Sequence, residues 1–354
     1  MEPFVYQSQP QRVVFGSGTL AAAGAELERL GHRRAMVLST PQQAASAAAL
    51  AGNLGALCAG TFTGAAMHTP TGVTETAMAA VGAAGADCIV SLGGGSTTGL
   101  GKAIALRTGL DQIVIPTTYA GSEATPILGE TVGGKKTTQR NSAILPEVIL
   151  YDVELTMSLP VALTVTSGLN AAAHAIEALY TQDRNPIISI LAVDGLRSLV
   201  AALPQLLGDA RNREARSNAL YGAWACGTCL GAVGMALHHR ICHVLGGSFE
   251  LPHSETHAVI LPHATAFNEV AVPELLQGAA RAIGAEQAGP GLYDLARSLR
   301  APMTLAEIGM PEAGLDRAAE MIVANPYWNP RPASREDVRR LLDDAYHGRR
   351  PSLH

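Results

Sequence analysis

The sequence has 354 residues, of which 47% are hydrophobic and 16% charged, with a formal net charge of −5. This apolar content excludes a largely disordered chain, and the length suffices for about two domains, each with its own core. The 25 Lys and Arg residues form no basic stripe among the 30 Asp and Glu residues, which argues against a nucleic-acid partner, because such partners need clustered cations.

Within residues 1–150, short apolar runs alternate with Ala-rich helical stretches. The expected strands are 12–15, 35–38, 88–92, 112–115 and 148–151, and the expected helices are 19–30, 41–53, 71–84 and 97–106. Continuously apolar strands that alternate with helices indicate a Rossmann-like α/β domain, a parallel sheet covered on both faces. Ligands of such sheets bind at the carboxyl ends of the strands, which makes the residues after 38, 92 and 115 the first site candidates.

After Pro160 the strand signals stop, and an all-α C-terminal domain is expected. Its expected helices are 171–180, 187–203, 215–237, 273–283, 291–298, 315–324 and 335–346. The domains are therefore expected to be 1–160 and 161–354. The uncharged stretch 219–237 is nearly long enough to cross a bilayer, but its Ala and Gly content favours a buried helix, so no membrane partner is expected.

Five cysteines are a sparse, odd-numbered set, and they indicate a reducing, cytoplasmic compartment rather than a disulfide framework. The pair Cys226 and Cys229 has Cys-x-x-Cys spacing but lies in an Ala/Gly-rich run, where buried inert thiols are expected. The first residues lack the basic and apolar regions of a signal peptide.

A glycine-rich turn follows the strand 88–92 and opens a helix. Gly93, Gly94 and Gly95 are followed there by Ser96 and Thr97. Glycines let backbone N–H groups approach a phosphate, and a helix N-terminus adds partial positive charge. The P-loop and the plain Rossmann fingerprint each fit only in part. A tight turn without a ligand is the alternative, but three consecutive glycines favour a pyrophosphate cradle.

A second loop at the same sheet edge follows the strand 112–115. It carries Thr117, Thr118, Tyr119 and Ser122, whose hydroxyl groups could hydrogen-bond an amide or a ribose. Such loops are common, so this segment is informative only together with the glycine turn.

The two loops together resemble the iron-containing alcohol dehydrogenase family, whose pattern is matched by Gly-Gly-Gly-Ser, then Lys102, then Pro-Thr-Thr and Gly-Ser-Glu. The resemblance extends over nearly the whole chain, including 15–18, 151–160, 168–178 and 239–262. It implies a dinucleotide domain, a helical domain, NADH or NADPH as cofactor and a homodimer. Lys102 and the residues of both loops are the implied cofactor-binding residues.

Within that family the chain looks most like the maleylacetate reductase branch. That resemblance implies a small dicarboxylate substrate, whose enone double bond is reduced to give 3-oxoadipate in aromatic-compound catabolism. A metal-dependent alcohol or glycerol dehydrogenase of the same family is the alternative enzyme. A further alternative is a regulator that binds NAD(H) without turnover.

Metal-dependent members of the family hold iron or zinc through an Asp, a His four residues later, and two further histidines. The matching positions here are Asn170, His174, His239 and His253, with His243 between the last two. The i, i+4 spacings 170/174 and 239/243 allow each pair to share one helix face, and His253 could approach from the following loop. Because the anionic ligand is missing, no required metal is expected, although three imidazoles can still hold zinc.

The resemblance makes His174, His239, His243 and His253 the expected catalytic residues. The last three would hydrogen-bond a developing enolate oxygen, and His243 would deliver a proton, because an imidazole can reach either protonation state near neutrality.

Asn170 and Arg240 are the expected substrate-binding residues, although Arg240 could equally form a salt bridge between the domains. Three further histidines are expected to be structural: His238, His257 and His263.

The residues after the strand 35–38 bear on the choice of cofactor. NAD-restricted folds place a carboxylate there that repels a 2′-phosphate, whereas Thr40 stands at that position here. Thr40 followed by Pro41 also fits a helix N-cap. Without the carboxylate, we expect both NADH and NADPH to be used.

Overall fold

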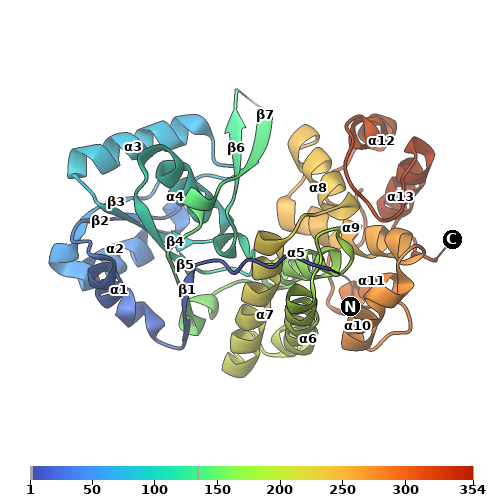
Figure 1. The fold of residues 1–354 in the computed structure, drawn as a ribbon, viewed down its shortest axis with the longest axis horizontal. Helices are drawn as coiled ribbons and strands as arrows, with labels where there is room; N and C mark the ends of the chain where they lie inside the picture. Colours follow the sequence, from blue (N-terminus) through green and yellow to red (C-terminus); the bar gives the residue numbers. More distant parts are fainter. Residues whose placement is uncertain (1–2, 134, 354) are drawn as a thin grey trace. The chain divides into compact units, whose positions relative to one another are not determined.

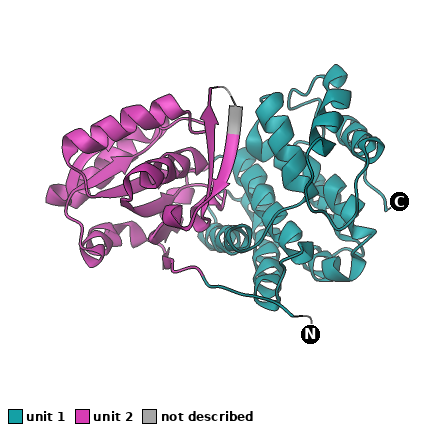
Figure 2. Ribbon diagram, turned by 45° about the horizontal axis from the view of Figure 1, so that its top comes forward, with its two compact units in different colours: residues 1–8, 160–354 teal, residues 9–159 magenta. Residues whose placement is uncertain are grey.

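The computed structural model describes residues 3–133 and 135–353. The chain divides into two compact units, an α/β unit of residues 9–159 and a helical unit from Pro160 onward (Figure 2). The described residues before Gln9, which the sequence analysis assigns to the first domain, group with the helical unit.

The α/β unit contains a six-stranded parallel sheet in the order β1-β8-β5-β4-β2-β3 (Figure 1). Its strands are β1 Arg12–Gly16, β2 Ala35–Leu38, β3 Cys58–Phe62, β4 Cys88–Gly93, β5 Asp111–Pro116 and β8 Val148–Asp152. The main helices of the unit are α1 Ala23–Leu30, α2 Ala44–Leu54, α3 Thr71–Ala84 and α4 Gly95–Thr108. The expected parallel α/β class is confirmed.

Alternation along each strand places the core on both faces of the sheet. In β2, Ala35 and Val37 pack into one apolar cluster with α1 and α2, whereas Met36 and Leu38 pack into the other with α3 and α4. This arrangement explains why the strand is apolar at every position.

Two elements of this unit were not expected. The edge strand β3 pairs only with β2 and has the weakly apolar sequence Cys-Ala-Gly-Thr-Phe. A hairpin joins β6 Ile127–Val132 to β7 Lys135–Arg140, and the second strand is polar throughout. Neither sequence shows the apolar run on which the strand prediction rests.

The helical unit is all-α within the described residues, as expected. Its helices are α5 Val161–Tyr180, α6 Pro186–Gly208, α7 Arg213–Ala232, α8 Leu237–Ser248, α9 His253–Glu269, α10 Pro273–Ile283, α11 Ala288–Ser298, α12 Leu315–Val323 and α13 Arg335–His347 (Figure 1).

The single helix expected at 215–237 is wrong, because the chain bends by 96° between α7 and α8. Asp183 accepts the Gly234 N–H at 3.0 Å and Glu177 accepts the Ala236 N–H at 2.9 Å, so two side chains distant in sequence hold the turn. His253 likewise begins α9 rather than lying in a loop.

One helix, α6, is long and apolar enough to cross a bilayer by length and composition. The bent pair α7 and α8 passes the same test only if it is taken as one span. Helix α6 packs against α5, α7 and α10.

Candidate active site

The glycine turn lies between the end of β4 and the start of α4. A side chain at Gly93, which has φ 154°, would meet Gln43 Oε1 at 2.7 Å, and one at Gly94 would meet Thr118 Cγ2 at 2.9 Å. At Gly95 the nearest atom is Ser122 Oγ, 3.8 Å away. A side chain at Gly93 or Gly94 would therefore displace neighbouring side chains, whereas one at Gly95 would make only an ordinary contact beside the helix N-terminus.

The start of α4 is suited to an anion. The Thr97 and Thr98 N–H groups donate to the Gly94 carbonyl at 3.1 Å, whereas the N–H groups of Gly95 and Ser96 have no acceptor within the helix. Among the described residues, the buried hydroxyl oxygens of Thr97 and Ser122 also have no hydrogen-bond partner. These residues fit the phosphate portion of a dinucleotide.

The neighbouring loop is tied to the glycine turn. The Thr117 N–H donates to the Gly93 carbonyl at 3.1 Å, and Gln43 Nε2 donates to Thr117 Oγ1 at 2.9 Å. Tyr119 is fully buried and belongs to the core of the loop. The sequence analysis missed Gln43, although its place after the strand 35–38 marks the carboxyl edge of the sheet.

Lys102 does not present its charge to a cofactor, contrary to expectation. Its ammonium group is buried and donates to the carbonyl oxygens of Ser122 at 2.6 Å, Thr125 at 2.6 Å and Ile127 at 2.9 Å. Burial lowers the pKa of Lys102 to about 7, against the attraction of Glu123. Lys102 therefore holds the loop 122–127 against α4.

Thr40 occupies the N-cap position of the short turn Pro41–Gln43, but its hydroxyl makes no capping hydrogen bond. The expected capping role of the side chain is therefore wrong. Thr40 is half-buried at the carboxyl end of β2, at the edge that carries the glycine turn.

A histidine cluster forms in the helical unit, where α5, α8 and α9 meet. His174 Nδ1 lies 2.9 Å from His239 Nε2, and the ring centroids of His239 and His243 are 6.2 Å apart. His253 lies at the start of α9, with its ring centroid 4.4 Å from that of His257. His174 and His239 are buried, whereas His243 and His253 are exposed.

Asn170 lies one turn before His174 on α5 and is 2% exposed. Its Oδ1 atom has no hydrogen-bond partner among the described residues. The position therefore presents a neutral, unpaired amide oxygen where metal-dependent members of the family that the sequence resembles have a carboxylate.

Glu177 belongs to this cluster, and the sequence analysis missed it. Its Oε2 accepts from His239 Nδ1 at 2.7 Å and from the Ala236 N–H at 2.9 Å, and its Oε1 accepts from the His238 N–H at 2.8 Å. Burial by itself would raise the pKa of Glu177, but the hydrogen bond from His239 and the nearby histidines lower it to about 2. The i, i+3 spacing from His174 could have revealed that both side chains share one face of α5.

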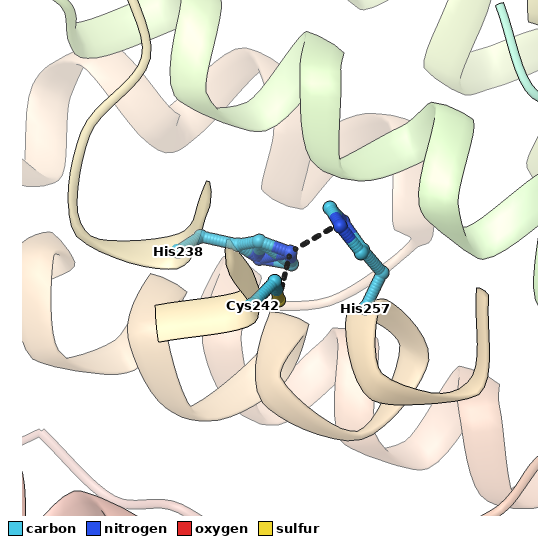
Figure 3. A group of neighbouring side chains, drawn as sticks. All are labelled: His238, Cys242 and His257. Carbon is cyan, nitrogen blue, oxygen red and sulfur yellow. Dashed lines mark hydrogen bonds between the residues drawn. The ribbon is translucent and has the colours of Figure 1, made fainter. Parts of the chain in front are cut away.

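A second group, shown in Figure 3, consists of His238, Cys242 and His257. His238 Nε2 lies 3.1 Å from His257 Nδ1 and 3.4 Å from Cys242 Sγ. Burial lowers the pKa of His238 to about 3 and also lowers that of His257, so both rings are neutral at pH 7.

These three donors are close enough to share a metal ion. A metal bound at His238 Nε2 and His257 Nδ1 would, however, place the ring N–H groups on His238 Nδ1 and His257 Nε2, which have no partner among the described residues. The group therefore suits a neutral hydrogen-bonded core better than a metal site.

Arg240 binds main-chain carbonyls at the end of α12. Its Nε donates to the Ile322 carbonyl at 3.1 Å and its terminal nitrogen to the Met321 carbonyl at 3.0 Å. A cation at a helix C-terminus satisfies carbonyls that have no partner in the helix. The structure thus gives Arg240 a part in capping α12, and its expected contact with substrate stays a prediction.

The four positions that match the family's metal ligands offer three imidazoles and an amide oxygen. The carboxylate of Glu177 binds the Nδ1 side of His239. A donor set without an anion leaves the charge of Fe²⁺ or Zn²⁺ uncompensated, so these residues do not fit a required metal of the family type.

Comparison with known proteins covers both units. The sequence model of iron-containing alcohol dehydrogenases matches residues 10–153, and the C-terminal model of the Fe-containing alcohol dehydrogenase family matches residues 164–346. The chain is 59% identical to a maleylacetate reductase of Rhizobium sp. (strain MTP-10005), over 99% of this chain and 100% of that one. It is 51% identical to a maleylacetate reductase of Burkholderia cepacia, with the same two coverages.

A crystal structure of maleylacetate reductase from Agrobacterium tumefaciens has a TM-score of 0.97 and 60% sequence identity, and the match covers 99% of this chain and 100% of that one. The likeness therefore includes both units and the connection between them.

Proposed function

This chain belongs to the iron-containing alcohol dehydrogenase family, and we propose that it is an oxidoreductase that reduces maleylacetate to 3-oxoadipate with NADH or NADPH. The observation that carries the proposal is 59% identity to a maleylacetate reductase over the length of both chains. The neutral Asn170 supports it, because an amide at this position does not repel a dianionic substrate as a carboxylate would.

The substrate carries a ketone conjugated to a carbon–carbon double bond. Hydride adds to the alkene carbon β to the ketone, charge develops on the ketone oxygen as an enolate, and a proton then adds to the adjacent carbon. Conjugation already delocalises this charge, so hydrogen-bond donors can stabilise it. Removal of one such donor typically raises a barrier by about 2.7–4 kcal/mol.

His243 and His253 are the members of the predicted catalytic set that contact substrate in this mechanism, because their side chains are exposed. Both ring nitrogens of His239 bind neighbours inside the protein, so His239 supports the site without touching substrate. His243 donates the proton and His253 hydrogen-bonds the enolate oxygen, because imidazole can donate near neutral pH.

The family's enzymes are NAD(P)-dependent dehydrogenases, and the glycine turn suits such a cofactor. The Gly95 and Ser96 N–H groups would hold the pyrophosphate, and the hydroxyl groups of Thr97, Thr118 and Ser122 lie nearby. When bound, the reduced nicotinamide supplies the hydride. Lys102 acts indirectly, by fixing the loop that carries Ser122.

Catalysis requires no metal ion in this proposal, since the donor set lacks an anion. The enzyme acts as a homodimer in the cytoplasm, on a small dicarboxylate and without a nucleic-acid or membrane partner. These features are inferred from the family resemblance and from the composition of the chain, which has a net charge of −5.

NADH oxidation with maleylacetate, before and after exhaustive chelation, tests the proposal. We expect turnover that chelation leaves unchanged. Loss of activity on chelation and its return with Fe²⁺ or Zn²⁺ would identify a metal-dependent dehydrogenase instead. Tight NADH binding without hydride transfer to any enone or carbonyl compound would identify a regulator.

A further inference from the structure

Glu177 is a fully buried carboxylate on α5 that takes no direct part in the proposed reaction. It contacts two distinct parts of the site at once. Its donors include the backbone N–H groups of Ala236 and His238, at the start of α8, and the His239 ring on that helix. One side chain thus fixes both the position of the helix and the orientation of a ring on it.

The carboxylate of Glu177 accepts each of these hydrogen bonds, and this determines which nitrogen of each neighbouring ring carries the proton. An ionised carboxylate only accepts, so the ring proton of His239 lies on Nδ1. A His239 ring that carries its one proton on Nδ1 accepts at Nε2, and the 2.9 Å contact is then donated by Nδ1–H of His174. His174 is therefore left with Nε2 as an acceptor.

We propose that Glu177 is a positioning residue for the reduction: it fixes the tautomer of His239 and, through it, that of His174, and it anchors the start of α8, which also carries His243. The catalytic part of this inference rests on the proposed function, whereas the tautomers do not depend on it. Serine proteases show the principle, because changing their buried Asp to Asn leaves the geometry intact and lowers kcat about 10⁴-fold through the wrong histidine tautomer.

The variant Glu177→Gln tests this role in the full-length enzyme. The amide replaces one carboxylate oxygen by a donor, so it cannot accept from both backbone N–H groups of α8 and from the His239 ring as the carboxylate does. We expect kcat with maleylacetate to fall by about 100-fold or more, while KM for maleylacetate and for NADH changes by less than about threefold. In ¹⁵N-histidine-labelled protein, NMR should show His239 protonated at Nδ1 in the wild type.

Two control variants separate this role from simple anchoring of the helix. Tyr180→Phe removes a hydroxyl that donates to Glu177 at 3.3 Å, and Asp183→Ala removes the acceptor of the Gly234 N–H, so neither touches His239. Both should keep kcat within about threefold of the wild type.

A kcat loss in Asp183→Ala as large as that in Glu177→Gln would overturn the inference. So would wild-type protein with His239 protonated at Nε2, a result that stands even if the Glu177 variant does not fold. Absence of maleylacetate reduction by the wild type would reject the proposed function instead, and would leave the tautomer measurement valid.

Discussion

At the scale of single residues, the amide of Asn170 gives the histidine cluster no negative charge at this position. Restoring a carboxylate with Asn170→Asp supplies an anionic ligand beside His174, so the variant should bind Fe²⁺ or Zn²⁺ more tightly than the wild type. The same charge should repel the dianionic substrate and lower kcat/KM for maleylacetate. Metal analysis of dialysed protein and steady-state kinetics measure the two effects. Equal metal content in both proteins would contradict the role given to this position.

Thr40 offers a second test of charge at a single position. Its hydroxyl makes no capping bond, and no carboxylate occurs in the segment 39–43. We expect kcat/KM for NADH and NADPH to lie within about tenfold of each other, equivalent to about 1.4 kcal/mol. Thr40→Asp should favour NADH by repelling the 2′-phosphate. A large wild-type preference for either cofactor, or no shift in the variant, would place the ribose elsewhere.

His263 gives the folded protein a predictable response to acid. Burial lowers its pKa to about 4, from about 6.5 in an unfolded chain. Between those values the unfolded chain binds a proton that the folded protein does not, so stability falls as the pH falls through that window. From pH 7 to pH 5 the loss is about 2 kcal/mol.

Urea unfolding at both pH values checks this expectation. The variant His263→Gln should lose less stability on acidification than the wild type. His347→Gln, at an exposed position near the end of α13, serves as the control and should keep the wild-type response. An unchanged pH dependence in His263→Gln would show that this histidine does not titrate as its burial implies.

At the scale of elements, the turn between β4 and α4 allows an effect on cofactor binding to be measured apart from an effect on packing. Gly95→Ala adds a methyl group with no neighbour closer than 3.8 Å, so the fold should persist while NADH binds about tenfold more weakly. Gly72→Ala, also in the first turn of a helix and with nothing within 4 Å, should leave NADH affinity unchanged. Calorimetric titration with NADH measures both, and equal affinities would reduce the turn to a simple connection.

The sequence predicted elements well where local pattern determines them. The continuously apolar β2 and β4 are buried on both faces, and α3 and α10 have their predicted bounds. The strand β7 could not be predicted in this way, because its polar sequence is ordered by pairing with β6. The break before α8 could not either, since it is held by carboxylates more than 50 positions away in the chain.

The candidate site shows the same division. The family resemblance pointed to His174 and His239, which the structure brings within hydrogen-bond distance. Residue type alone could not show that Lys102 and Arg240 donate to main-chain carbonyls, because charged side chains near a site are available for either purpose until their neighbours are known. Glu177 was missed because its role depends on the break before α8, where it accepts the Ala236 N–H, and the sequence pattern did not predict that break.

At the scale of the whole molecule, the division into units has a topological consequence. The α/β unit takes one continuous segment, 9–159, whereas the helical unit takes chain from both sides of it. The α/β unit is thus one continuous segment inserted into the chain that forms the helical unit. Its first and last sheet strands, β1 and β8, are neighbours in register, with Arg12 opposite Val148, so all six strands of the open sheet belong to this unit.

An inserted unit of this kind should fold without the helical unit. A fragment of residues 9–159 is expected to fold alone and to bind NADH with nearly the affinity of the full chain, because the glycine turn and the loop that Lys102 holds both lie inside it. Circular dichroism and calorimetric titration of the fragment check this, and an unfolded fragment would contradict it. If the α/β unit folds alone, cofactor specificity can be exchanged between relatives by replacing one uninterrupted stretch of the gene. The histidine cluster then stays unchanged in the helical unit.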